Sequence, residues 1–368
     1  MATELYIGIM SGTSHDGIDA AIVAVDDNCL TLTATAHHSY SKKFRQRLLD
    51  FNQLNNNRSL DQVLPTGREF SALVCQLVES LLASNNITPK QITAIGCHGH
   101  TLCHNPLGQL GYSYQLMDGA ALAIDTGIAV VCDFRSGDIA LGGTGAPLAP
   151  AFHRFLFSKH QKNLVIANIG GIANITLLPT DDINTVGFDT GPGNLLMDYC
   201  MERHFNKQYD NRGEMARSGS VDAPLLNKLL SNEYFNLPAP KSTGRELFNG
   251  RWLDSHNSDQ IDPKNQLATV TELTAISIAT AIKRLAVDEG SVLVCGGGSH
   301  NDYLLDRLQH HCGDWNVTTT SSVGFDPDWI EAAAFGWLAH QRWHHLPGNL
   351  ASVTGAKRQT ILGAVYLP

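Results

Sequence analysis

The segment 186–194 is the strongest candidate for chemistry in this chain. It reads Val-Gly-Phe-Asp-Thr-Gly-Pro-Gly-Asn, and apolar residues at helical spacing follow it. Because Pro192 suits the first turn of a helix, the pattern predicts a strand that ends at Asp189 and a helix N-terminus just after it. Free N–H groups and partial positive charge there would favour a phosphate and keep Asp189 ionised. Such a carboxylate can act as a general base, and a plain N-cap is the alternative role.

A second candidate is the turn between two apolar runs near the start of the chain, 5–10 and 20–25. The runs predict a β-hairpin, in which Gly12 and Gly17 allow positive φ and close approach of a ligand. The turn also supplies hydroxyls, and carboxylates suited to hydrated Mg²⁺: Thr13, Ser14, Asp16 and Asp19. These groups suit a nucleotide phosphate tail, although a polar hairpin without a ligand explains them equally well.

Two further glycine turns follow apolar runs of strand length. Gly170 and Gly171 lie in the turn 168–174. After the run 292–295, the consecutive residues Gly296, Gly297 and Gly298 leave room for a flat ring directly on the backbone. The chain contains neither GxGxxG at this place nor GxxxxGK[ST] anywhere, which excludes dinucleotide-binding and P-loop interpretations.

Arg135 and Glu331 are candidate substrate-binding residues. Arg135 follows a run that predicts a strand ending near Cys132, and its guanidinium could pair with a substrate carboxylate. A surface ion pair with Asp133 or Asp138 is the competing explanation. Glu331 opens a predicted helix, where it would also favour the helix dipole.

The run 97–104, Cys-His-Gly-His-Thr-Leu-Cys-His, raises the hypothesis of a zinc site. We recognise no second ligand pair that would complete a tetrahedral set, so polar binding residues or structural histidines are the favoured interpretation. The other histidines of the chain show no spacing that predicts a metal site. The segment 241–245, Lys-Ser-Thr-Gly-Arg, is interpreted as a solvated basic loop, with contact to an anion as the minor alternative.

The elements around these residues form a pattern that occurs twice. Each time a strand, a glycine turn and a second strand are followed by a helix and then by a strand that ends in glycine. This pattern predicts an α/β protein of two lobes, joined within the glycine-rich region 137–150. We place residues 1–135 and 348–368 in lobe I and residues 136–347 in lobe II.

Composition narrows the class of protein. The 368 residues are 43% hydrophobic and 17% charged, which is typical of a globular protein large enough for two domains. A net charge of −9 argues against a nucleic-acid or anionic-membrane surface. No apolar run is long enough to cross a bilayer, no signal-peptide pattern opens the chain, and the eight cysteines are scattered. We therefore expect a cytoplasmic protein without a disulfide framework.

Taken together, the motifs resemble the anhydro-N-acetylmuramic acid kinase family along almost the whole chain. The resemblance is carried by the segments 10–19, 96–99, 133–135, 168–174, 188–194, 238–246, 295–299 and 347–350. It implies the fold of the actin, sugar kinase and Hsp70 superfamily, with two ribonuclease H-like lobes around a central cleft. It also implies that ATP and water convert 1,6-anhydro-N-acetylmuramic acid into N-acetylmuramic acid 6-phosphate and ADP during cell-wall recycling.

The same resemblance implies roles for individual residues. Asp189 would activate the water, and Asp16 and Asp19 would lie near Mg²⁺. His98, Arg135 and Glu331 are expected to contact the sugar. The expected ATP-binding residues are Gly12, Thr13, Ser14, His15, Asp16, Gly17, Ile18, Asp19, Gly170, Gly171, Gly296, Gly297 and Gly298.

One departure from the family pattern is His100, where the family usually has Gln; contact with the sugar would make its hydrogen bonding pH-dependent. The expected partner is a small anhydro sugar, without nucleic acid or membrane, and a homodimer stays open. A kinase for another sugar or small acid is the alternative enzyme. A nucleotide-driven assembly or chaperone protein is the alternative class, but no residues remain for a separate peptide-binding domain.

Overall fold

The hairpin expected near the start of the chain is present in the computed structural model. The structure describes residues 3–12, 15–26, 28–51, 59–158, 163–179, 185–256, 260–285, 287 and 289–368. β1 (Glu4–Ser11) pairs antiparallel with β2 (Gly17–Val25), and most side chains of both strands are buried. Thr13 and Ser14 lie outside the described residues, so their expected roles stay predictions.

The chain divides into two units. Unit 1 comprises Met1–Leu156 and Trp329–Pro368, and unit 2 comprises Phe157–Asp328. The sequence analysis placed residues 136–347 together in lobe II, whereas the segments 136–156 and 329–347 belong to unit 1 in the structure. The physical reason is packing, because the helix that follows Trp329 lies against the strands at the start of the chain.

Unit 1 is a mixed sheet with helices on both faces. Its remaining elements are β3 (Leu30–Ser39), α1 (Lys42–Phe51), α2 (Leu60–Ser84), η1 (Pro89–Gln91), β4 (Ile92–Asn105), β5 (Tyr112–Leu116), α3 (Gly119–Thr126), β6 (Val130–Cys132), α4 (Ser136–Ala140), α5 (Ala149–Phe157), α12 (Ile330–Trp343), α13 (Ala351–Thr354) and β12 (Ala364–Tyr366). Among the described residues the strand order is β12-β6-β4-β1-β2-β3, with β5 attached to β4. β1, β4 and β6 run parallel, which aligns the ends of β4 and β6 that carry polar residues.

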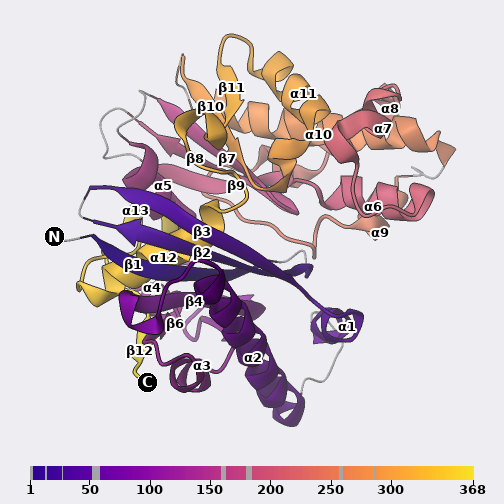
Figure 1. Cartoon of the computed structure of the whole chain (residues 1–368). Helices are drawn as coiled ribbons and strands as arrows, with labels where there is room; N and C mark the ends of the chain where they lie inside the picture. The colour runs from indigo at the N-terminus through magenta and orange to yellow at the C-terminus, as the bar shows by residue number, and fades with distance from the viewer. Residues whose placement is uncertain are drawn as a thin grey trace. The chain divides into compact units, whose positions relative to one another are not determined.

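The two faces of this sheet are covered differently. α2 and α3 pack under the sheet (Figure 1), where they share one apolar cluster with residues such as Ile7, Ile22 and Phe70. α12 packs against β1, β2 and β4. It approaches very closely, because a Cβ at Gly96 would lie 1.9 Å from the carbonyl oxygen of Phe335. Helix α2 confirms the helix that was expected after the first hairpin.

Unit 2 has a smaller sheet and more helices. Its elements are β7 (Leu164–Ile169), β8 (Ile172–Leu178), β9 (Val186–Pro192), α6 (Leu195–Phe205), η2 (Asn211–Gly213), α7 (Glu214–Arg217), α8 (Ala223–Leu230), η3 (Glu233–Asn236), α9 (Gly250–Asp254), α10 (Pro263–Lys283), β10 (Ser291–Cys295), η5 (Gly297–His300), α11 (Asp302–Cys312), β11 (Asn316–Thr319) and η6 (Thr320–Val323). Within the described ranges the strand order is β11-β10-β7-β8-β9. The long helix α10 packs against α6, α11 and β9 around one apolar core (Figure 1).

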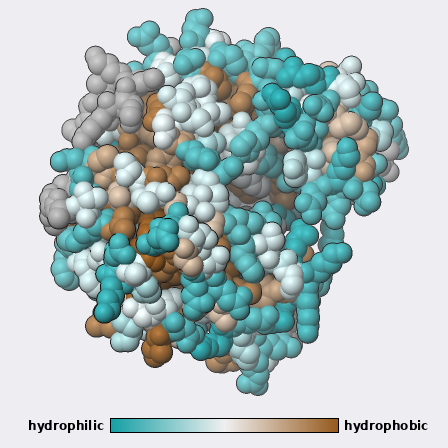
Figure 2. Space-filling model, viewed as in Figure 1, coloured by the Kyte–Doolittle hydropathy of each residue, from teal (hydrophilic) through white to brown (hydrophobic). Residues whose placement is uncertain are grey.

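The surface agrees with the acidic, polar composition. In the view of Figure 2, hydrophilic and intermediate residues cover most of the described surface, and smaller hydrophobic patches lie among them. Among the described residues, no helix is both long and apolar enough to cross a bilayer.

Candidate functional site

Asp189 lies inside strand β9 and not at its end. Strand register makes Asn174 of β8 its cross-strand partner, and Asn174 in turn pairs with Asn168 of β7. Directly opposite residues of antiparallel strands share a face of the sheet. The register therefore produces a row of three polar side chains across β7, β8 and β9, with Asp189 at one end.

A distant segment, residues 241–243, holds the Asp189 carboxylate. The Ser242 hydroxyl donates to Asp189 Oδ2 at 2.9 Å, and the Thr243 backbone N–H donates to the same oxygen at 3.0 Å. The Asp189 N–H donates to the Lys241 carbonyl at 3.1 Å, and the Tyr234 hydroxyl donates to the Asp189 carbonyl at 2.7 Å. Four hydrogen bonds therefore fix both the backbone and the side chain of Asp189.

Burial decides the protonation behaviour of Asp189. Loss of water around the carboxyl raises its pKa, and the negative charge of Glu246 acts in the same direction. The donors on Thr243 and Ser242 lower the pKa but do not cancel the effect of burial. A carboxylate with a raised pKa is a better proton acceptor, which is what a general base requires.

The segment between Asp189 and the helix that follows differs from the prediction. α6 begins at Leu195, and Pro192 ends β9, so Pro192 does not lie in a first helical turn. The amides of Gly193, Asn194 and Leu195 donate to the carbonyls of the turn 170–171 at 2.8–3.2 Å. These N–H groups are therefore already paired. Asn194, and not Asp189, holds the N-cap position.

The glycine turns of unit 2 meet at one edge of its sheet. β7 and β10 run parallel with Cys295 opposite Asn168, so the turns that follow the two strands lie together. A Cβ at Gly296 would lie 2.5 Å from Asn168 Oδ1, and a Cβ at Gly298 would lie 2.4 Å from Ile169 Cγ2. Only glycine permits these approaches. The buried Ser299 hydroxyl has no hydrogen-bond partner within the described part of the chain, so a polar ligand group could satisfy it.

The segment 241–245 is more than the solvated basic loop that the sequence analysis favoured. The ammonium of Lys241 lies 4.4 Å from the ring centre of Tyr234 and donates to the Tyr234 carbonyl at 2.9 Å. Arg245 extends toward the glycine turn, since a Cβ at Gly171 would lie 3.8 Å from its Nη2. One segment therefore borders both Asp189 and the turn 170–171.

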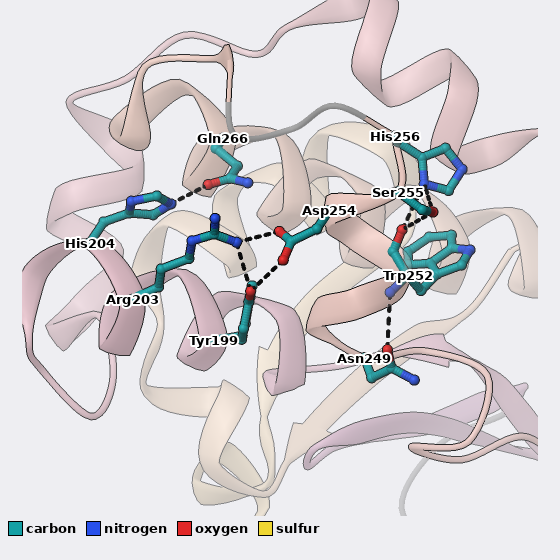
Figure 3. Close-up of polar contacts among 9 residues, drawn as sticks. All are labelled: Tyr199, Arg203, His204, Asn249, Trp252, Asp254, Ser255, His256 and Gln266. Atoms are coloured by element: carbon teal, nitrogen blue, oxygen red, sulfur yellow. Dashed lines mark hydrogen bonds and ion pairs between the residues drawn. The ribbon is translucent and has the colours of Figure 1, made fainter.

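A polar network attaches α6, the helix after Asp189, to α9. Figure 3 shows that Arg203 and Asp254 meet and that the Tyr199 hydroxyl lies between them. The Tyr199 hydroxyl donates to Asp254 Oδ2 at 2.7 Å and accepts from Arg203 Nη1 at 2.7 Å. These groups satisfy one another, so we assign the network a structural role.

A pocket of about 580 Å³ in unit 2 is separate from Asp189. Phe188 and Thr190 of β9 line it. Because neighbouring residues of a strand point to opposite faces, Asp189 points away from this pocket. The pocket is therefore not the site of the candidate base.

In unit 1, the structure brings Arg135 and His98 together. Arg135 precedes α4 and donates to Nε2 of His98 from Nη2 at 2.8 Å and from Nε at 3.3 Å. Its Nη1 donates to the Gly145 carbonyl at 2.7 Å. Because Nε2 of His98 accepts, the neutral ring carries its proton on Nδ1. Arg135 is not in a surface ion pair, since no ion pair to it occurs among the described residues.

Burial also shifts the pKa values in this part of unit 1. Loss of water lowers the pKa of Arg135 to about 10, while the charges of Glu331 and Asp138 act to raise it. Burial and the Arg135 charge hold the pKa of His98 well below its usual value. Glu331 lies in the first turn of α12, as predicted, and is exposed. The three expected substrate residues of unit 1 are thus electrostatically coupled.

The turn 12–19 presents its carboxylates in different settings. Asp16 is exposed, whereas Asp19 of β2 lies 2.7 Å from His37 Nδ1. Gly17 does not have the positive φ that was expected, because it begins β2; a Cβ there would lie 2.4 Å from the His38 carbonyl oxygen. His15, at φ 57°, and Ile18 are both buried.

His100 is buried in a small network of unit 1. Its Nδ1 lies 2.9 Å from the Ser11 hydroxyl, which lies 2.7 Å from the Tyr40 hydroxyl. Burial, with a contribution from His15, lowers the pKa of His100 to about 3. The ring therefore stays neutral near neutral pH, and the pH-dependent hydrogen bonding expected for a charged His100 does not arise there.

Several residues that shape the site were not predicted as site residues. They are Asn168, Asn174, Ser242, Thr243 and Arg245. Their places in the motif segments 168–174 and 238–246 were visible in the sequence. The contacts of Ser242 and Thr243 to Asp189 were not, because they join segments more than fifty residues apart.

Comparison with known proteins agrees with the motifs. The family model for anhydro-N-acetylmuramic acid kinase matches residues 4–368. An anhydro-N-acetylmuramic acid kinase of Coxiella burnetii (strain Dugway 5J108-111) is 45% identical over 368 residues, covering 100% of this chain and 98% of the relative. The kinase of the same name from Saccharophagus degradans is 45% identical over 375 residues, with 100% of both chains covered.

Similarity to solved structures is much weaker. A ROK family glucokinase from Streptomyces griseus, in complex with glucose and AMPPNP, is 13% identical and has a TM-score of 0.43. The alignment covers 92% of this chain and 99% of the glucokinase.

Proposed function

The chain belongs to the anhydro-N-acetylmuramic acid kinase family, and from that premise we propose that Asp189 is the base that activates water in its reaction. The enzyme uses ATP to phosphorylate 1,6-anhydro-N-acetylmuramic acid at O6 while water opens the anhydro bridge, in cell-wall recycling. The products are N-acetylmuramic acid 6-phosphate and ADP.

The chemistry explains why one carboxylate can suffice. Water attacks C1, the C1–O6 bond breaks, and its electron pair leaves with O6. O6 then attacks the γ-phosphorus and displaces ADP, so the phosphoryl group takes the place of the proton that an ordinary glycosidase acid would supply. The proton lost by the water passes to the base and then to solvent.

The observation that carries this assignment is the set of contacts around Asp189. Neutral donors on Ser242 and Thr243 orient one carboxylate oxygen, and no ion pair to Asp189 occurs in the described part of the chain. A cation directly bound to the carboxylate would lower its basicity. Here burial raises its pKa, so the carboxylate is oriented and still basic.

Arg135 is proposed to bind the acidic group of the sugar. Neutral His98 and the Gly145 carbonyl hold the guanidinium without cancelling its charge. A charge-assisted hydrogen bond from a buried guanidinium favours a carboxylate over a neutral group. The lactyl carboxylate of the substrate is the acidic group it would bind, and exposed Glu331 would contact the neutral polar part of the sugar.

ATP binding is assigned to the glycine turns. Gly170, Gly171 and residues 296–298 lie together at one edge of the unit 2 sheet, and Arg245 adds positive charge near Gly171. The turn 12–19 of unit 1 offers carboxylate oxygens on Asp16 and Asp19, the donor type that Mg²⁺ prefers. Mg²⁺ held there would neutralise phosphate charge. Asp16→Ala should then weaken binding of Mg-ATP in a nucleotide titration, and unchanged binding would contradict that role.

We also propose that the reaction takes place in the cytoplasm, because it consumes ATP. The test is mass spectrometry of the products formed from ATP and the anhydro sugar in ¹⁸O-water. We expect one ¹⁸O in the sugar at C1 and phosphate at O6. Label found in inorganic phosphate, or a phosphorylated sugar whose bridge is intact, would contradict the proposal and favour a kinase for another sugar.

A further inference from the structure

A cluster of three metal-binding residue types lies in unit 1, outside the residues assigned to the reaction. Glu4 begins β1, His340 lies in the last turn of α12, and His344 is the residue that caps α12. One ligand atom from each of the three lies within 4.8 Å of the others. Glu4 Oε2 is 2.7 Å from His344 Nε2 and accepts from the Tyr6 hydroxyl at 2.5 Å.

The packing of α12 on β1 in unit 1 brings Glu4 close to His344. α12 contacts β1 where two glycines face each other, since a Cβ at Gly336 would lie 3.3 Å from the Gly8 nitrogen. From that contact, four residues of strand lead back about 13 Å to Glu4. Eight residues of helix lead forward about 12 Å to His344. Glu4 and His344 therefore lie at about equal distances from the contact between Gly8 and Gly336, one along the strand and the other along the helix.

Helical spacing places the two histidines on one side of α12. His340 and His344 are four residues apart, and their ring centres are 4.6 Å apart. Two histidines at this spacing are a common zinc-binding pair. The sequence analysis did not single out this spacing as a metal-binding pattern.

We propose that Glu4, His340 and His344 bind a divalent transition-metal ion of the zinc type. Two imidazoles and a carboxylate suit zinc, whose bonds to such ligands are about 2.0–2.2 Å long. In a tetrahedral arrangement the ligand atoms are then roughly 3.3 Å apart, so only small side-chain rotations are needed. Water supplies the fourth ligand.

The full or partial burial of these three side chains suits an ion that binds tightly. The His340 side chain is buried, whereas the Glu4 and His344 side chains are 31% and 19% exposed, which leaves an entry path. Tyr6 donates to the carboxylate and orients it, as second partners of metal ligands commonly do. A bound ion ties the first residue of β1 to the last turn of α12 and so stabilises unit 1.

Among the described residues, no other histidine–carboxylate contact has a third ligand atom this close. His311 lies 2.7 Å from Glu272, but Arg307 occupies both oxygens of that carboxylate. Within the described ranges, the cluster at Glu4 is the one in which three such ligand atoms come this close. His311 therefore offers a matched control.

The test uses the full-length protein, stripped of metal by a chelator and titrated with Zn²⁺ alone and with Co²⁺ alone. We expect one equivalent of Zn²⁺ to bind by calorimetry and to raise the Tm. Co²⁺ should give the visible absorption of a four-coordinate site. His344→Ala and Glu4→Gln should each weaken Zn²⁺ binding at least about a hundredfold, because even loss of an indirect partner costs roughly 10–100-fold.

Variants at partly exposed positions keep the test independent of folding. His344→Ala and Glu4→Gln are first checked for a cooperative thermal transition without metal, and His311→Ala must bind Zn²⁺ as the unchanged protein does. Affinity that is unchanged in either ligand variant overturns the site. A sulfur-to-cobalt charge-transfer band would place the ion on a cysteine and overturn it as well.

Discussion

Two carboxylates of unit 2, Glu272 and Asp189, are held in opposite ways. Glu272 of α10 accepts from Arg307 at 2.7 and 2.8 Å and lies 2.7 Å from His311. Asp189 accepts from a hydroxyl and a backbone N–H. Burial raises the pKa of both groups. Hydrogen bonds from the Arg307 and His311 side chains outweigh burial at Glu272 and lower its pKa, whereas neutral donors leave the pKa of Asp189 raised.

The difference separates a structural charge from a reactive one. A buried carboxylate that is paired with cations is stable in its ionised form and has little tendency to take a proton. A buried carboxylate held by neutral dipoles keeps that tendency, at some expense in stability. Arg135 of unit 1 resembles Asp189, because it is a buried charge held by neutral groups, but its charge is positive. Its partners are neutral His98 and the Gly145 carbonyl.

The largest effect should come from removing the reactive charge. Asp189→Asn should lower kcat at least about a hundredfold, the range typical of a lost general base. Nucleotide affinity should change little, because Asp189 is assigned to water. The measurements are the rate of sugar 6-phosphate formation and a nucleotide titration.

Glu272→Gln is the matched control for that experiment. It removes a charge from the same unit, and kcat should stay within about threefold of the unchanged enzyme. If both variants lose activity equally, or if Asp189→Asn keeps near-normal turnover, the distinction between the two carboxylates fails.

The next largest effect is expected at Arg135, the buried charge of unit 1 that neutral groups hold. Arg135→Ala should raise the KM for the anhydro sugar roughly tenfold or more and change the KM for ATP much less, since a charged hydrogen bond is lost. Arg203→Ala, which breaks the network of Figure 3, should leave both KM values within about twofold. Equal rises for sugar and ATP after Arg135→Ala would indicate a structural role.

The neutral donors at Asp189 can be tested through pH. Activity should fall as pH drops through the raised pKa of Asp189, because a protonated base accepts no proton. Ser242→Ala removes a donor that stabilises the charged form, so this acid limb should move up by about one pH unit. A pH–rate profile measures it, with Ser255→Ala as control. An unmoved limb would mean that the Ser242 hydroxyl does not stabilise the Asp189 carboxylate.

The smallest effect concerns stability. Because the pKa of Glu272 is lower in the folded than in the unfolded protein, its stabilisation is present above the ordinary glutamate pKa of 4.5 and is lost as pH falls through the folded pKa. Glu272→Gln should reduce the free energy of unfolding by about 1–3 kcal/mol at pH 7, and the deficit should shrink below pH 4. Asp189→Asn should show no such deficit. Urea unfolding of both variants at pH 7 and below pH 4 measures these differences in the free energy of unfolding.

Much of the fold was predictable from local patterns. Both hairpins were confirmed, because two apolar runs that flank a glycine turn are a local signal. A helix after the first hairpin and a helix opened by Glu331 were also expected, and they are present as α2 and α12. The boundary between the units was not, because the packing of α12 on β1 joins residues more than three hundred positions apart.

The sequence by itself determined the family and the reactive residue types, since motif segments and the order of strands and helices are written along the chain. Only the tertiary structure decided what surrounds Asp189. The amides of residues 193–195 donate to the carbonyls of the turn 170–171, and a loop about fifty residues away supplies the donors to Asp189. Burial and hydrogen bonds between distant segments determine the pKa of Asp189, and neither can be deduced from the spacing of residues along the chain.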